Sequence, residues 1–183
     1  MLPAANMENL TDEQLIEKIK NNQELFGILI DRYKNKLERY VFYLINRKDE
    51  LDDIVQEIFI KVFINLNSFD TKKKFSAWFF RIAHNQVVNF FKKYKKTLSI
   101  RDDLKIIDDK NIEEDFEKKE LKEILKKCID EISLDYKEII LLYYFQDLSY
   151  EEISDVLKIP AGTVATKLSR AKKILKKLCQ NKI

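Results

Sequence analysis

The sequence predicts an all-α protein made of two small helical domains joined by a flexible linker, with a helix-turn-helix in the C-terminal domain. Three observations support this fold class. Only two glycines and two prolines occur among the 183 residues, so few positions force a helix to end. Apolar residues recur at intervals of three and four through most of the chain, as in amphipathic helices. An acidic stretch with poor periodicity separates two such segments.

The first periodic segment, residues 8–96, is predicted to be the N-terminal domain. Thr11 and Gln14 have the spacing of a capping box, which indicates a short helix after Thr11. A long amphipathic helix follows, with apolar positions from Leu25 to Leu44. Asp52 and Asp53 mark the start of a third helix, because its dipole favours acids there. The apolar positions of that helix are Ile54, Val55, Ile58, Phe59, Val62, Phe63 and Leu66.

A fourth, aromatic helix follows the loop NLNSFDTKKK and ends in the basic run Lys92 to Lys96. Phe75, Phe79 and Phe90 fall at helical spacings in it and are interpreted as core residues. The predicted linker, residues 97–116, comes next. Nine acidic and five basic residues lie between Arg101 and Glu120, a net charge of −4, which is typical of a solvated segment.

The predicted C-terminal domain, residues 117–183, contains one helix with apolar positions from Leu121 to Ile132 and a second that starts near Asp135. Ser149 and Glu152 form another capping box, which opens a helix through Leu157. A last helix is predicted from about residue 163 to beyond residue 178.

The turn between the last two helices predicts a helix-turn-helix. Pro160 prevents the earlier helix from continuing, because it lacks an N–H and clashes with the preceding turn. Gly162 is expected to leave space at a tight entrance to the later helix, and Thr163 to cap that helix or bond a phosphate. From residue 156 to the C-terminus there are eight basic residues and no acid, a charge pattern suited to nucleic acid.

Composition argues against several other classes. We expect no transmembrane span, because no run of apolar residues is long enough, and the N-terminus lacks the pattern of a secretory signal. Cys128 and Cys179 stand apart from any metal-binding spacing, as expected of free thiols in a reducing cytoplasm. One histidine, no phosphate-binding glycine loop and no nucleophile elbow leave no plausible active site, so no enzyme, metal or cofactor is expected.

Two motifs in order resemble the sigma factors of the extracytoplasmic-function (ECF) type, in the sigma-70 family. LSYEEISDVLKIPAGTVATKLSRAKKIL resembles their C-terminal helix-turn-helix domain. DDIVQEIFIKVFINLNSF with FSAWFFRIAHNQVVNFFKK resembles their N-terminal domain. The resemblance covers nearly the whole chain and implies a promoter-specificity subunit of RNA polymerase, with core polymerase (β and β′) and promoter DNA as its partners. Most of the family is controlled by anti-sigma factors, so such a partner is expected here.

The resemblance also implies three groups of contact residues. The motif DIVQE corresponds to the contact with the polymerase clamp, which gives Asp53, Gln56, Glu57 and Lys61. The −10 element is expected to be held as a single strand, with bases stacked or extruded. The candidates for that role are Asn67, Ser68, Phe69, Asp70, Thr71, Lys73, Lys74, Trp78, Arg81, Asn85, Asn89, Lys92 and Lys93. Trp78 can also be read as a core residue, and His84 as exposed near phosphate.

The −35 element is expected to be read as duplex by the last helix. Its candidate contacts are Thr163, Ala165, Thr166, Lys167, Ser169, Arg170 and Lys173. Ala165 and Ser169 depart from the larger side chains common in the family, so the resemblance implies no particular −35 sequence. A stand-alone helix-turn-helix regulator is the alternative, but it leaves the DIVQE motif and the aromatic loop unexplained.

Overall fold

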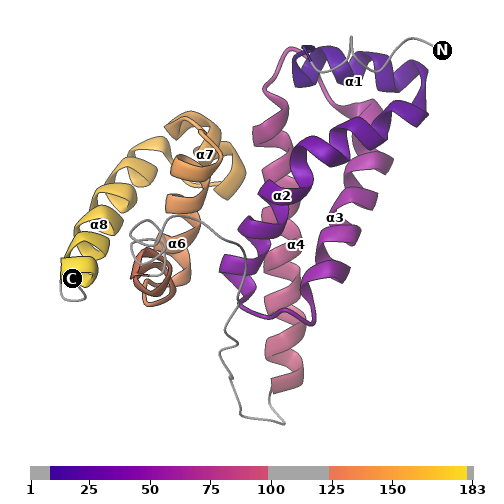
Figure 1. The fold of residues 1–183 in the computed structure, drawn as a ribbon. Helices are drawn as coiled ribbons and strands as arrows, with labels where there is room; N and C mark the ends of the chain where they lie inside the picture. Colours follow the sequence, from indigo (N-terminus) through magenta and orange to yellow (C-terminus); the bar gives the residue numbers. More distant parts are fainter. Residues whose placement is uncertain (1–8, 99–123, 181–183) are drawn as a thin grey trace, which may run out of the picture.

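The computed structural model describes residues 9–98 and 124–180, and every regular element in these residues is helical (Figure 1). The all-α prediction is confirmed. The predicted linker, residues 97–116, lies outside the described residues except for 97 and 98. Residues 121–123, at the start of the first predicted helix of the C-terminal domain, also lie outside them. The elements are α1 (Asp12–Asn21), η2 (Gln23–Leu25), α2 (Phe26–Ile45), α3 (Leu51–Asn65), η3 (Leu66–Ser68), α4 (Phe75–Leu98), a helical segment at 124–130, α6 (Leu134–Ile140), η4 (Leu141–Phe145), α7 (Tyr150–Leu157) and α8 (Ala161–Gln180).

Helices α1–α4 form the N-terminal bundle, with α1 across one end of the other three (Figure 1). The predicted capping box is present: the Gln14 backbone N–H donates to Thr11 Oγ1 at 3.3 Å, and the Thr11 N–H donates to Gln14 Oε1 at 3.0 Å. Asp12 then ties α1 to α2, since it accepts from Arg32 at 2.8 Å and from the Tyr33 hydroxyl at 2.5 Å.

Aromatic rings fill the centre of the N-terminal bundle. Tyr33 lies 5.3 Å from Phe75 and 4.6 Å from Phe79, measured between ring centroids, and Phe79 lies 5.3 Å from Phe80. Phe75, Phe79 and Phe80 are completely buried. The core role predicted for Phe75 and Phe79 is confirmed, whereas Phe90 is only half-buried.

The C-terminal bundle contains segment 124–130 and helices α6, α7 and α8, with the π-helical turn η4 after α6. Its predicted capping box is also present, because the Glu152 N–H donates to Ser149 Oγ at 3.2 Å and the Ser149 N–H donates to Glu152 Oε2 at 2.7 Å. The core of its helix-turn-helix is aliphatic and consists of Ile153, Val156, Val164, Leu168 and Ala171.

The helix-turn-helix turn differs from the prediction in its details. Lys158 ends α7 with a left-handed backbone, φ 58°, so the reversal happens two residues before Pro160. Helix α8 already begins at Ala161, and the Pro160 carbonyl accepts from the N–H groups of Thr163 and Val164. Thr163 therefore lies within the first turn and is not the cap. Gly162 is helical, and a methyl group added at its Cα would meet no heavy atom within 4 Å, so the expected tight entrance is wrong.

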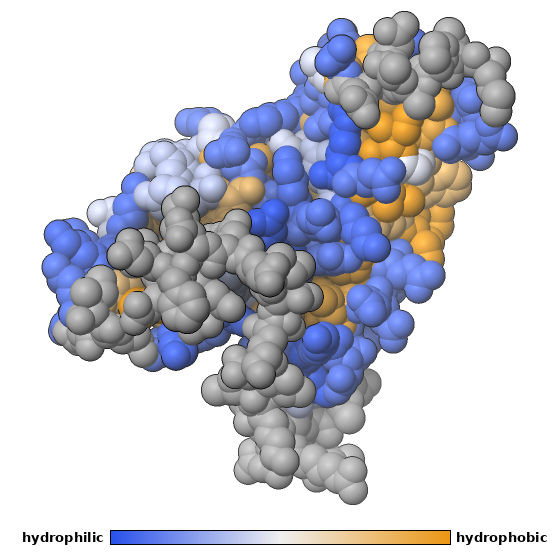
Figure 2. Space-filling view, viewed as in Figure 1, coloured by the Kyte–Doolittle hydropathy of each residue, from blue (hydrophilic) through white to orange (hydrophobic). Residues whose placement is uncertain are grey.

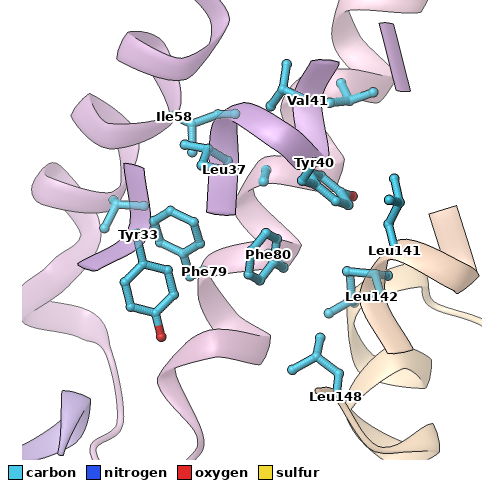
Figure 3. Close-up of a cluster of buried hydrophobic side chains, with 14 of the residues drawn as sticks. Tyr33, Leu37, Tyr40, Val41, Ile58, Phe79, Phe80, Leu141, Leu142 and Leu148 are labelled. Atoms are coloured by element: carbon cyan, nitrogen blue, oxygen red, sulfur yellow. The ribbon is translucent and has the colours of Figure 1, made fainter. Parts of the chain in front are cut away.

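The two bundles pack against each other through α4 with α7 and α2 with α6. Tyr40 and Phe80 of the N-terminal bundle face Leu141, Leu142 and Leu148 of the C-terminal bundle (Figure 3). All five side chains are at most 1% exposed, so one apolar core runs through both bundles. The sequence predicted the two units but not this shared core.

Candidate nucleic-acid and polymerase interface

The residues predicted to bind polymerase lie on α3. Asp53, Gln56 and Glu57 are exposed, and Gln56 and Glu57 lie one helical turn after Asp53. Lys61, a turn further, is half-exposed, and its ammonium lies 3.6 Å from Glu57 Oε1. With side chains 40% and 48% exposed, this pair remains available to a partner, and an exposed ion pair adds little stability.

Gln86 joins these residues to α4. Its amide accepts from Lys61 Nζ through Oε1 and donates to Glu57 through Nε2, and its side chain is buried. A buried amide with both of its groups bonded holds its neighbours in place. Gln86 therefore fixes Glu57 and Lys61 against α4, the helix that carries six of the thirteen −10 candidates. The sequence reasoning missed Gln86, which lies next to the predicted Asn85.

Three apolar residues on α3 are exposed: Ile60 is 51% exposed, Phe63 40% and Ile64 69%. Phe63 is one of the apolar positions of the helical pattern; its ring contacts Phe26 at 4.9 Å between ring centroids, but it also faces solvent. Figure 2 shows apolar surface along the right-hand edge, where Figure 1 places α3. Ile60 lies four residues after Gln56 and Ile64 four after Ile60, so the polar candidates and this apolar stripe are continuous.

A pocket of about 290 Å³ between α3, η3 and α4 brings together three of the −10 candidates, Ser68, Trp78 and Asn85. Its remaining wall consists of Lys61, Asn65, Ile82 and Gln86. Trp78 is neither a pure core residue nor a free platform: its ring packs on Phe69 and Phe75 and also lines the pocket. An aromatic wall facing amide and hydroxyl groups suits an unpaired base, which needs both stacking and edge hydrogen bonds.

The loop ahead of α4 has an ordered interior. Phe69 is only 3% exposed and contacts Phe75 and Trp78, so the expectation that it faces a base disagrees with this structure. Its carbonyl accepts from Lys20 Nζ at 2.9 Å, which ties the loop to α1. Ser68 Oγ donates to the Asn65 carbonyl at 2.7 Å, and Thr71 donates to Glu17 at 3.0 Å. Phe69 thus supports the Trp78 wall from behind.

The remaining −10 candidates divide between the loop and the outer side of α4. Asn67, Asp70, Lys73, Arg81, Asn89 and Lys92 are exposed. Asn89 and Lys93 line a second hollow of about 440 Å³ between α3 and α4, which Asp53 and Glu57 also line. In this hollow the guanidinium carbon of Arg47 lies 4.7 Å from the centroid of the Tyr94 ring. The sequence reasoning did not single out this pair of residues.

The −35 candidates lie on the first four turns of α8. Ser169, Arg170 and Lys173 are exposed, while Thr163 and Ala165 are half-buried. Thr166 is exposed, but its hydroxyl donates to the Gly162 carbonyl at 2.9 Å within the helix. Lys167 forms an ion pair with Asp135 at 3.0 Å, so DNA would have to compete for it. Lys172, which the sequence reasoning passed over, lies about 5 Å from the rings of Tyr143 and Tyr144.

His84 departs from the expectation of an exposed residue near phosphate. Its side chain is 19% exposed, and Nδ1 lies 2.7 Å from Glu138 Oε1 on α6. A carboxylate only accepts hydrogen bonds, so Nδ1 carries the proton. In this arrangement the residue belongs to the contact between the bundles.

Comparison with known proteins decides the family. Two family models match, Sigma-70 region 2 over residues 29–97 and Sigma-70, region 4, over residues 122–175. The ECF RNA polymerase sigma factor SigW of Bacillus subtilis (strain 168) is 30% identical over 182 residues, covering 93% of this chain and 97% of SigW. The chain belongs to the ECF sigma factors. The ECF RNA polymerase sigma-E factor of Escherichia coli (strain K12) is 31% identical, with 92% and 94% covered.

Solved structures share the fold of this ECF sigma factor. CnrH in complex with the cytosolic domain of CnrY matches with a TM-score of 0.68 at 23% identity, covering 93% of this chain and 97% of CnrH. The sigma factor RpoE in complex with the anti-sigma factor NepR from Bartonella quintana also matches with a TM-score of 0.68 at 23% identity, covering 88% and 98%.

The family assignment makes the chain an alternative sigma factor, a regulatory DNA-binding protein that gives RNA polymerase its promoter specificity. Within residues 9–98 and 124–180, no group of three or more histidine, cysteine or acidic side chains could hold a metal ion. Among those same residues, no helix combines the length and apolarity needed to cross a membrane.

Proposed function

We propose that this ECF sigma factor binds core polymerase through α3, captures the −10 element as a single strand against α4, and reads the −35 element as duplex with α8. The observation that carries the proposal is the pocket between α3 and α4, where the predicted Ser68, Trp78 and Asn85 meet. It offers one aromatic wall and several polar groups at the size expected for one small ligand group.

The proposed polymerase surface combines the exposed polar residues of α3 with the apolar stripe of Ile60, Phe63 and Ile64. Binding surfaces generally pair an apolar centre with a polar rim, and this stripe supplies the apolar part. Charge reversal of Glu57 would break its contacts with both Lys61 and Gln86. The same substitution would place the wrong charge on the proposed interface.

The first experiment reconstitutes the sigma factor with core polymerase and maps transcript starts. Glu57→Lys should abolish stable holoenzyme, while Asp31→Lys, an exposed acid on α2, should leave it intact. Asn85→Ala should leave holoenzyme assembly intact but weaken promoter opening at least tenfold, and exposed Asn35→Ala is its matched control. No association of the unmodified chain with core polymerase would end the proposal.

We further propose that an anti-sigma factor controls this chain, as the partner in the RpoE–NepR complex illustrates for a relative of the same fold. Purification of the tagged protein from its own cells, before and after stress, should recover an additional protein beside polymerase subunits. Recovery of polymerase subunits alone under every condition would contradict this regulation.

We also propose an N-terminal domain at 8–96, a linker at 97–116 and a C-terminal domain at 117–183. We propose that the protein is cytoplasmic and catalyses no reaction of its own. The alternative of a stand-alone regulator predicts tight, specific duplex binding without polymerase. The basic α8 is compatible with that alternative, but the pocket and the apolar stripe on α3 favour the sigma role.

A further inference from the structure

Three polar side chains meet inside the contact between the two bundles. The Tyr40 hydroxyl of α2 donates to Glu138 Oε1 of α6 at 2.5 Å, and His84 Nδ1 of α4 lies 2.7 Å from the same oxygen. Two elements of the N-terminal bundle thus converge on one carboxylate of the C-terminal bundle. We call these residues, Tyr40, His84 and Glu138, the interbundle triad.

Water has little access to the triad. Tyr40 is completely buried, and the side chains of Glu138 and His84 are 12% and 19% exposed. Burial, and then the neighbouring Glu138 carboxylate, raise the pKa of the Tyr40 hydroxyl well above its ordinary value, so it stays protonated and donates. Hydrogen bonds to a poorly hydrated charged group are among the stronger ones in proteins.

Tyr40 of the triad also faces the apolar contact of Figure 3, and a second polar contact lies between Lys74, just before α4, and the start of α7. There Lys74 Nζ lies 3.3 Å from Glu152 Oε2 and 3.4 Å from the Asp147 carbonyl oxygen. Lys74 is one of the −10 candidates, so this packing occupies a residue that DNA would need. Both Lys74 and Glu152 are partly exposed, so of the two polar contacts we assign the larger contribution to the triad.

The packed arrangement cannot serve both promoter elements at once. The −10 and −35 elements are named for their promoter positions, which are about 25 base pairs apart. At about 3.4 Å per base pair, this separation is about 85 Å of B-DNA. A compact protein of 183 residues has a radius of gyration of about 16 Å, hence a diameter of about 40 Å. The bundles must therefore separate before both elements can be bound.

We propose that the interbundle triad is a latch that holds the free sigma factor closed and unable to span a promoter until core polymerase separates the bundles. The inference rests on the proposed function for what closure prevents, but the latch itself is a property of the chain alone. Breaking it leaves the Tyr40 hydroxyl and His84 without their carboxylate in the closed form, whereas water satisfies them in the open form. Loss of the Glu138 carboxylate should thus lower the closed-to-open ratio about tenfold to a hundredfold.

The test measures the distance between the bundles by fluorescence energy transfer in the full chain, without polymerase or DNA. Dyes are attached at Asn35→Cys on α2 and Lys176→Cys on α8, both exposed, with Cys179→Ser to prevent mislabelling. The parent chain should give one short-distance population. Glu138→Ala should add a long-distance population at unchanged helicity, and Glu151→Ala, an exposed acid of the same bundle, should not.

Tyr40→Phe is the second variant, because it removes one hydroxyl and keeps the buried ring. It should shift the population in the same direction but less. Short distances in both Glu138→Ala and Tyr40→Phe would overturn the latch, even if the chain proved an active sigma factor.

Core polymerase added to the labelled parent chain should convert it to long distances. A bound chain that keeps its short distance would overturn the latch, whereas failure to bind polymerase would defeat the proposed function and leave the Glu138→Ala comparison standing.

Discussion

The two bundles differ in how their candidate binding residues lie relative to the hydrophobic core. In the N-terminal bundle the candidate base platform, Trp78, packs directly on Phe69 and Phe75, so the proposed binding surface and the core share one aromatic layer. In the C-terminal bundle the exposed Arg170 and Lys173 lie on the opposite side of α8 from Leu168 and Ala171, which face an aliphatic core. Stacking an unpaired base requires an aromatic side chain that other aromatic side chains hold in place. A phosphate contact requires only a charged side chain on a stable helix.

The largest effect is expected from the aromatic layer. Phe79→Ala removes a completely buried ring that contacts Tyr33, Phe75 and Phe80, and should lower the free energy of unfolding by about 3–5 kcal/mol. Denaturant titration followed by the fluorescence of Trp78, the sole tryptophan, measures this directly. Phe63→Ala is the matched control, since a ring that is 40% exposed should contribute much less. Equal losses would show that the layer has no special role.

A smaller and more local effect is expected from the aliphatic core. Leu168→Ala should lower stability by about 2–4 kcal/mol, because Leu168 is 1% exposed between α8 and its neighbours. Helicity should fall at lower denaturant, while the Trp78 transition moves by less than half as much. Coincident shifts in the two signals would mean that the shared core makes both bundles one cooperative unit, and the contrast between them would then be one of chemistry alone.

These cores also show what the sequence could and could not predict. Both capping boxes, the aromatic helix and the helix-turn-helix depend on spacing within one segment, and spacing is visible in a sequence. Glu138 gave no signal, because its partners Tyr40 and His84 are 98 and 54 residues away and nothing local distinguishes it from a solvated acid.

Turns and half-buried rings were predicted less well for a related reason. Gly162 was credited with a tight turn that Lys158 makes instead, since a left-handed backbone at lysine is set by the packing of two helices and not by residue type. The family resemblance gave Phe69 a role in holding a flipped base, yet its burial against Trp78 depends on where α4 lies. The family resemblance also suggested Asn85, and the sequence left Trp78 open between core and base contact; only the folded structure added Gln86 and Asn65 to the pocket.

The capping boxes should give nearly equal, moderate effects in the two bundles. Thr11→Ala and Ser149→Ala each remove one side-chain acceptor for a helix N-terminal N–H, and each should lower stability by about 1 kcal/mol. Ser169→Ala, at an exposed position inside α8, should change stability by less than about 0.5 kcal/mol. A much larger loss for Ser149→Ala would show that the start of α7, without its side-chain acceptor, also weakens the Glu152–Lys74 ion pair and loosens the contact between the bundles.

The smallest effect separates charge from packing on α8. Lys173 is exposed, so Lys173→Gln should leave the fold unchanged and only remove one phosphate contact, lowering the slope of log K against log salt for promoter binding by the holoenzyme by about 0.9. Lys167→Gln should change the slope less, because Lys167 must first leave Asp135, which lies 3.0 Å away. Sequence preference should stay the same in both, since phosphate contacts position a protein without reading bases. If Lys173→Gln altered the preferred −35 sequence and left the slope unchanged, this residue would be a base reader, and the simple division between a charged helix and an aromatic pocket would need revision.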